Sequence, residues 1–275
     1  MHAMHARLPV NFVLEERLER YADAIEKQPA VYRGCWTRAC WPLGKSGNGF
    51  DEVRVDLGCG KGAFIVESAR REPNVLFVGI DAEPLCMAYA AQRIMEADLR
   101  NAVVVPLQGD ALQRIFAPGE VSTIHLNFPT PYPRKRDAAR RLVSLERLIE
   151  YREVLADSGT LRLRTDSQPL RDFALTQLDL AGYRIVHSSE DERAEHPDEP
   201  SSEYEERLCA AGAHVLALWA SPANKPVCSE QTASLSLVDY LPEDLFEGRY
   251  VPHGMEQTIV NLRRQKERAA RGGRA

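Results

Sequence analysis

Cysteine pairs with metal-binding or redox spacing are absent from this sequence, and so are long apolar runs. None of the six cysteines forms a Cys-x-x-Cys pair, so the sequence predicts neither a zinc finger nor a disulfide framework. No segment approaches the roughly 18 consecutive apolar residues of a membrane-spanning helix, and residues 1–30 lack the apolar core of a secretory leader. We therefore expect a cytoplasmic protein that contacts no membrane and binds no metal ion.

A large excess of positive charge is also missing. The net charge is −5, with 44% hydrophobic and 27% charged residues, which is the balance of a globular protein with a sizeable core. A negative total argues against a nucleic-acid partner, because phosphate binding depends on Lys and Arg. Basic residues nevertheless gather at 134–141 and 263–274, and local patches decide what a surface attracts. The acidic stretch 190–206 is expected to be a solvated loop, with the alternative that it holds its end, 202–205, over a substrate.

Three zones are expected along the chain. Residues 1–52 form an N-terminal arm with one helix over 12–25, where apolar residues recur at helical spacing. Residues 53–220 form the core domain. Residues 221–275 form a C-terminal extension outside that core, and 255–268 within it are either a basic helix or a solvated tail.

Strand and helix patterns alternate through the core domain. The predicted strands cover 53–57, 75–80, 102–107, 121–128, 159–165, 183–187 and 214–219. The predicted helices cover 63–71, 84–97, 142–155 and 169–181. This alternation predicts an α/β fold with a mostly parallel seven-stranded sheet and helices on both faces. Ligands of such sheets bind beyond the carboxyl ends of the strands, where the strand order reverses.

A glycine-rich turn with a preceding acid follows the first strand. Gly58 and Gly60 allow a tight turn and a close approach to a ligand, and the helix that begins near Gly62 supplies free N–H groups at its positive end. The spacing also fits the dinucleotide fingerprint, which is a weak signal by itself. Asp56 discriminates between a dinucleotide and a cationic ligand. Its carboxylate would repel the pyrophosphate of a dinucleotide but attract a cationic ligand by about a few kcal/mol. The turn therefore predicts S-adenosylmethionine, whose ammonium and sulfonium groups are both positive.

Further polar residues follow the next strands. Asp81 ends the second strand, where a carboxylate accepts hydrogen bonds from ribose hydroxyls. Asp110 follows the third strand and is expected to accept from the adenine amino group. Each of these acids has the alternative role of a helix N-cap. Ala111, beside Asp110, and Asn127, at the end of the fourth strand, complete the predicted cofactor site.

The loop after the fourth strand combines prolines, an aromatic ring and basic residues. Three prolines within five residues, in the segment 126–136, predict a stiff and extended backbone. Tyr132 stands beside the basic triplet 134–136, and Arg140 and Arg141 are expected to extend the positive surface. Rings and guanidinium groups together suit an unstacked base and its phosphates. The same composition also fits a rigid surface loop with solvated charges.

This loop resembles the signature of the tRNA (guanine-N7)-methyltransferase family, an Asp-Pro-Trp-Pro-Lys-Lys-Arg type segment followed by paired basic residues. The segment 164–166, Arg-Thr-Asp, resembles the family's Thr-Asp substrate motif, and 202–205, Ser-Glu-Tyr-Glu, resembles its Thr-x-Phe/Tyr-Glu motif. The resemblance covers about residues 53–220. It implies a Rossmann-like class I methyltransferase domain that moves a methyl group from S-adenosylmethionine to N7 of a guanosine in the tRNA variable loop.

The sequence departs from the family pattern at several positions. Thr130 replaces the loop acid, Tyr132 the Trp, Arg134 the Lys, Asp137 the following His and Ser202 the Thr. The resemblance implies catalytic roles for Thr130 and Asp166. It implies that the substrate is contacted by Tyr132, Arg134, Asp166, Ser202 and Glu205.

The chemistry tolerates the loss of the loop acid. Guanine N7 has an in-plane lone pair and no proton to lose, so no general base is required, and alignment supplies about 7–11 kcal/mol of the barrier. Thr130 cannot carry the negative charge that stabilises a cationic purine, but Asp166 or Glu205 can. Two alternatives stay open. One is a small-molecule methyltransferase, which would need an apolar lid, and the other is a relative that binds cofactor or RNA without reacting.

Overall fold

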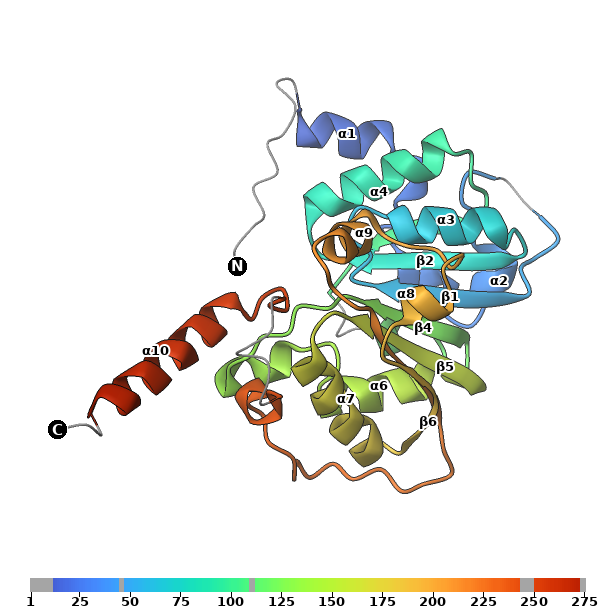
Figure 1. Ribbon diagram of the computed structural model, residues 1–275. Helices are drawn as coiled ribbons and strands as arrows, with labels where there is room; N and C mark the ends of the chain where they lie inside the picture. The colour runs from blue at the N-terminus through green and yellow to red at the C-terminus, as the bar shows by residue number, and fades with distance from the viewer. Residues whose placement is uncertain (1–11, 45–46, 109–111, 243–249, 273–275) are drawn as a thin grey trace.

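A computed structural model shows an α/β protein built on one seven-stranded sheet (Figure 1). It describes residues 12–44, 47–108, 112–242 and 250–272. The strand order is β3-β2-β1-β4-β5-β7-β6. The strands are β1 (Glu52–Leu57), β2 (Val75–Asp81), β3 (Ala102–Pro106), β4 (Val121–Asn127), β5 (Leu155–Thr165), β6 (Tyr183–Ser189) and β7 (Leu216–Pro222).

Neighbouring strands from β3 to β5 pair in parallel, whereas β7 pairs antiparallel with both β5 and β6. Among the parallel strands, β2 and β3 are nearly continuous apolar runs because both of their faces are covered. The predicted mostly parallel seven-stranded sheet is therefore confirmed.

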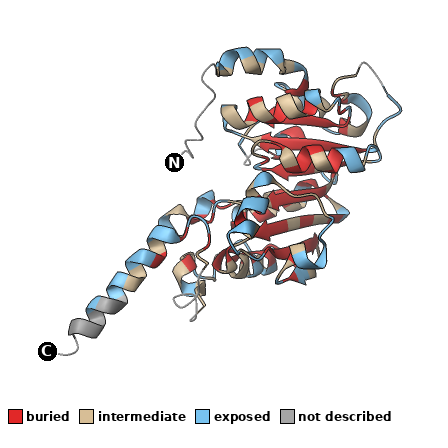
Figure 2. Cartoon of the chain, turned by 45° about the horizontal axis from the view of Figure 1, so that its top comes forward, coloured by how far each residue is buried: buried red, intermediate tan, exposed pale blue. Residues whose placement is uncertain are grey.

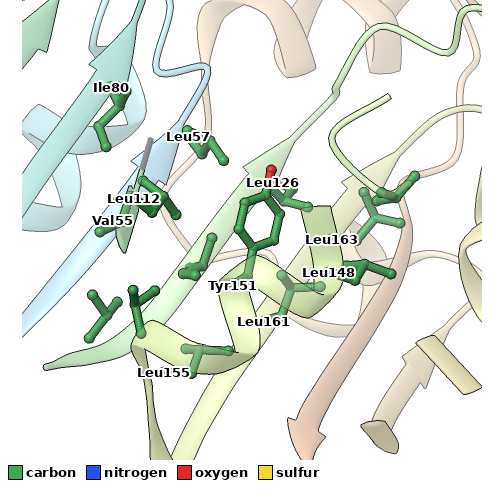
Figure 3. Packing of buried hydrophobic residues seen from close by; sticks show 14 of the residues in the cluster. Val55, Leu57, Ile80, Leu112, Leu126, Leu148, Tyr151, Leu155, Leu161 and Leu163 are labelled. Carbon is green, nitrogen blue, oxygen red and sulfur yellow. The ribbon is translucent and has the colours of Figure 1, made fainter. Parts of the chain in front are cut away.

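The helices lie in layers on the two faces of the sheet. On one face α3 and α4 pack over the apolar side chains of β2 and β3. On the other face α5, α6 and α7 enclose the larger core, in which Leu148 and Tyr151 of α6 meet Val55, Leu126 and Leu161 from three strands (Figure 3). The helices are α1 (Leu14–Arg20), α2 (Trp36–Ala39), α3 (Ala63–Arg71), α4 (Pro84–Glu96), α5 (Leu112–Ile115), α6 (Leu145–Val154), α7 (Gln168–Leu180), α8 (Glu192–Glu195), α9 (Glu203–Ala210) and α10 (Glu256–Gly272).

The N-terminal segment packs against the sheet. Its predicted helix is shorter than expected, because α1 ends at Arg20 and a 3-10 turn follows over Ala22–Ala24. Ile25 then forms a parallel bridge with Val104, which adds backbone pairing to the edge strand β3. The fully buried side chain of Trp36 belongs to the main hydrophobic cluster. The arm therefore contributes both to the core and to the protection of a sheet edge.

The C-terminal stretch returns to the core, and the expectation that it lies outside is wrong. Leu237, Met255 and Ile259 are at most 1% exposed and belong to the main hydrophobic cluster. Their side chains form the apolar surface that packs this segment against the core. The mostly polar composition of the segment did not predict this packing. Beyond Ile259 the helix α10 projects away from the body, with mostly exposed and half-buried residues (Figures 1 and 2).

None of the helices within the described ranges combines the length and apolar character that spanning a bilayer requires.

Candidate functional site

The centre of the sheet carries a buried carboxylate at the point where the strand order reverses. The chain runs from β1 outward through β2 to β3 and then returns to β4 on the other side of β1. Asp56 near the end of β1 and Asn127 at the end of β4 flank this switch point, where ligands of open α/β sheets bind. The Asn127 amide nitrogen donates a 3.1 Å hydrogen bond to Asp56 Oδ1.

Asp56 is 2% exposed. Burial raises its pKa to about 7, the hydrogen bond from Asn127 opposes that shift, and the negative charge of Asp81 adds to it. A carboxylate in this position lacks solvation, so a cationic ligand beside it would lower the pKa again and be held strongly.

The glycine turn has the geometry that the sequence predicts. Gly58, Gly60 and Gly62 all have positive φ, at 81°, 54° and 76°. A Cβ on Gly62 would come within 2.8 Å of Ala90 Cβ, so this glycine lets α3 approach α4 closely. A Cβ on Gly60 would meet no atom within 4 Å, which leaves space for a ligand above the turn.

Asp81 holds the turn from the next strand. Its Oδ2 accepts a 3.0 Å hydrogen bond from the Gly60 N–H, and its Oδ1 accepts a 2.9 Å bond from the Glu83 N–H. Each carboxylate oxygen keeps a second lone pair for a ribose hydroxyl, so the predicted role is compatible with this position. Asp110 and Ala111 lie outside the described residues.

The proline-rich loop after β4 is bent rather than uniformly extended. Phe128 and Tyr132, which precede prolines, have φ values of 50° and 43°, so the expected extended backbone is wrong at these two residues. The left-handed region is costly for non-glycine residues and occurs at functional sites. The strain is held by Arg141, which donates to Pro131 O (3.0 Å) and Tyr132 O (2.7 Å).

Arg141 therefore does not extend the positive surface as expected. Its side chain is fully buried, its guanidinium stacks over the Phe173 ring at 4.4 Å, and burial lowers its pKa to about 10. The loop carbonyls compete successfully with solvent for this guanidinium because they are fixed and buried. Arg140, by contrast, is exposed and stacks over the Tyr132 ring at 4.2 Å.

The remaining loop residues predicted to act on a substrate face solvent. Thr130 and Arg134 are exposed, and Tyr132 is half-buried. Lys135 and Arg136 are exposed beside Arg134, so the basic triplet is available to a polyanion.

Asp166 at the end of β5 is contacted by the C-terminal stretch. Its Oδ2 accepts a 2.6 Å hydrogen bond from the Tyr250 hydroxyl and a 2.8 Å bond from the His253 N–H. Burial, followed by this bond to Asp166, raises the pKa of Tyr250. A Cβ on Gly254 would come within 3.0 Å of Pro131. Residues 250–254 therefore border the predicted site, although no sequence signal pointed to them.

The residues of the segment 202–205 make contacts of different kinds. Ser202 is the N-cap of α9, and its hydroxyl accepts from the Glu205 N–H at 3.1 Å. Tyr204 packs its ring edge-on against Phe128 at 5.8 Å and near His253 at 5.5 Å. Burial and the charge of Asp166 raise the pKa of Tyr204. Tyr204 thus joins the proline-rich loop to the C-terminal stretch.

Glu205 is turned away from solvent. It is 2% exposed and pairs with Arg193, while Arg164 lies 3.9 Å away. Its carboxylate is therefore engaged by arginines that hold α9 against the sheet. The expectation of a solvated loop over 190–206 is wrong here and at Glu192, which is also 2% exposed.

Comparisons with known proteins agree with this geometry. Residues 51–218 match the family model described as a putative methyltransferase. The chain is 32% identical over 200 residues to a tRNA (guanine-N(7)-)-methyltransferase of Geobacillus kaustophilus, which covers 72% of this chain and 88% of that protein. It is 29% identical over 199 residues to the protein of the same name from Bacillus subtilis, covering 72% and 90%. Among solved structures, the 16S rRNA methyltransferase KamB shares the fold, with a TM-score of 0.50 and 18% identity over 63% of this chain and 89% of that one.

Proposed function

The chain belongs to the tRNA (guanine-N(7)-)-methyltransferase family, and from this premise we propose that it methylates N7 of a guanosine in the variable loop of tRNA. The methyl donor of this class is S-adenosylmethionine. The observation that carries the proposal is the buried Asp56 carboxylate beside three positive-φ glycines at the switch point of the sheet.

The residues at the switch point fit this cofactor. Asp56, with its raised pKa, is a buried acid that lacks a cationic partner among the described residues. Gly60 leaves space above the turn for a ligand, and Asp81 would hold the ribose hydroxyls. Asn127 holds the Asp56 carboxylate in place. When bound, the cofactor supplies a methyl group on a positively charged sulfur that is already a good electrophile.

The chain's own contribution to the reaction is alignment and charge. Guanine N7 attacks through a lone pair, so no residue has to remove a proton. Asp166 is placed to stabilise the positive charge that develops on the purine, an electrostatic contribution on the order of a few kcal/mol. Tyr250 and His253 both donate to its Oδ2, and Oδ1 is the oxygen that we expect to act on the base. Thr130 contributes a hydroxyl at the position where the family has an acid.

The substrate side suits an RNA loop. Tyr132, held by Arg140, offers a ring for stacking, and the exposed triplet 134–136 offers positive charge to phosphates. Ser202 and Glu205 act indirectly in this proposal, because they cap and anchor the helix that carries Tyr204. The segment 250–254 closes the site beside Asp166.

Mass spectrometry of nucleosides tests the proposal. Unmodified tRNA is incubated with the full chain and S-adenosylmethionine, digested and analysed for 7-methylguanosine. We expect this nucleoside to appear in amounts that approach one per tRNA, and sequencing of the methylated tRNA to place it in the variable loop.

Two further measurements distinguish the alternatives. In an assay with labelled cofactor, label that enters a metabolite extract but not tRNA identifies a small-molecule methyltransferase and overturns the proposal. Calorimetry that detects cofactor binding without turnover on any tRNA identifies a non-reacting relative. Methylation at a different guanosine overturns only the choice of the variable loop.

A further inference from the structure

Two histidines and two glutamates meet on the sheet face opposite the larger core, away from the proposed methyl-transfer site. His187 belongs to β6, Glu192 and Glu195 belong to α8, and His196 follows α8 directly. One ligand atom of each residue lies within 4.8 Å of those of the other three. We propose that this cluster binds a divalent transition-metal ion and that the ion is Zn²⁺, since imidazole and carboxylate groups together are typical zinc ligands.

The backbone places the four side chains before any ion arrives. Residues 192, 195 and 196 are related by three and four positions, so one turn of helix presents them on the same face. The Asp191 side chain caps that turn, and the Glu192 N–H donates to Val215 O at 2.7 Å. His187 is paired in register with Trp219 of β7. The sheet and the helix cap therefore set the distances within the cluster.

Glu192 gives an independent sign of a missing ligand. Its side chain is 2% exposed, and its Oε1 has no hydrogen-bond partner in the part of the chain that the structure describes. Its Oε2 lies 2.7 Å from His187 Nε2. A buried carboxylate oxygen without a partner costs free energy, and a bound cation would satisfy it.

The charges around the cluster favour binding of a cation with moderate affinity. The two glutamates supply two negative charges, and the ring of Trp219 lies 4.3 Å from that of His187 and forms an apolar wall. Arg162, stacked on Trp219 at 4.1 Å, is a positive group that opposes the ion. The neighbouring Arg164 is neutralised by Glu199 and Glu205.

An ion can reach the cluster from solvent. Glu195 and His196 are exposed, and both line a cavity of about 490 Å³ between the sheet and the segment 197–200. Once bound, the ion would tie α8 to the edge strand β6. Residues 196–202 connect α8 to α9, so the ion would also stabilise the segment that carries Tyr204 against Phe128. Its role is therefore structural.

Titration of the full chain tests this site. The protein is dialysed against a chelator and titrated with Zn²⁺ by calorimetry, and the bound metal is counted by mass spectrometry. We expect one ion per chain. His196→Ala, which changes an exposed residue, and His187→Ala are each expected to weaken binding at least about tenfold, as is Glu192→Gln. His253→Ala is the control, because His253 is an exposed histidine that pairs with Glu256 in the C-terminal stretch and contacts neither α8 nor its cap.

Co²⁺ provides a second readout. Its visible absorption reports imidazole and carboxylate coordination, and we expect the spectrum of the wild-type chain to be lost in His196→Ala and kept in His253→Ala. Circular dichroism of each metal-free variant identifies any that fail to fold. Absence of stoichiometric Zn²⁺ binding, or equal binding by the wild-type chain and a folded His196→Ala variant, overturns the proposal and leaves an ion-paired cluster without metal.

Discussion

The Asn127 side chain donates a hydrogen bond to the buried Asp56 carboxylate across 3.1 Å, which links the carboxyl ends of β1 and β4. This contact orients an acid that burial would otherwise leave poorly solvated. It also explains how one carboxylate can be retained at 2% exposure, since a fixed donor replaces part of the lost water. The proposed cofactor site is thus preformed by its own strands.

Asp56→Asn should stabilise the fold above pH 7 and weaken cofactor binding. The folded pKa of Asp56 is about 7 against an ordinary value of 3.8. The folded state therefore binds the proton more tightly, and its free energy of unfolding falls as pH rises from about 4 to 7. Above pH 7 the variant, which lacks this charge, should be more stable than the wild type by on the order of 1 kcal/mol or more. Urea denaturation at pH 5 and pH 8 measures the difference.

The affinity of Asp56→Asn for S-adenosylmethionine should fall at least about tenfold in calorimetry, because the charge attraction is lost. Asp51→Asn removes an exposed acid near the start of β1 and should change neither quantity. Normal cofactor affinity in Asp56→Asn would remove the basis of the proposed function.

Arg141→Ala should affect stability, and Arg140→Ala should affect tRNA binding. The first variant leaves the carbonyls of Pro131 and Tyr132 without their buried donor and should lower the free energy of unfolding by about 2 kcal/mol or more. The second removes an exposed guanidinium, so stability should change by less than about 0.5 kcal/mol while tRNA binding weakens and becomes less salt-dependent. Urea denaturation and filter binding at two salt concentrations separate the two. Equal stability of both variants would contradict the role assigned to Arg141.

Thr130→Asp should accelerate methyl transfer. Thr130 is exposed, so an acid can be introduced there without a folding cost, and its charge would stabilise the cationic purine. We expect kcat on tRNA to rise by about tenfold, measured with labelled cofactor. Thr130→Asn has a similar shape without the charge and should stay near the wild-type rate. A large loss in Thr130→Asp would count against N7 as the methylated atom.

Tyr250→Phe should slow methyl transfer without affecting the cofactor. The change removes the 2.6 Å hydrogen bond to Asp166 and frees the carboxylate to rotate. We expect kcat to fall by about threefold to tenfold, which corresponds to one hydrogen bond, with unchanged cofactor affinity.

Tyr240→Phe is the matched control for Tyr250→Phe, because it removes a hydrogen bond to Ser234 O within the same stretch and should leave kcat unchanged. An increase in kcat for Tyr250→Phe would indicate instead that the C-terminal stretch restrains Asp166.

Patterns among residues close in sequence were sufficient to predict the strands and helices of the central sheet domain. The alternation of apolar strands and amphipathic helices predicted all seven strands, and Ala63–Arg71 was predicted with the observed bounds. The positive φ of Gly58, Gly60 and Gly62 also followed from residue type, because only glycine adopts that conformation freely. Local spacing and intrinsic backbone preference are properties that a sequence carries directly.

Contacts between distant segments were decided by the tertiary structure alone. Arg141 looks like a surface cation in the sequence, yet the loop folds its carbonyls over it. Residues 250–259 look like part of a solvated extension, yet Tyr250 reaches Asp166, and Met255 and Ile259 enter the core. Burial and partnership depend on where the chain returns in space. These contacts are stabilised when surfaces from distant segments pack together, and the composition of a segment does not show which surface it will pack against.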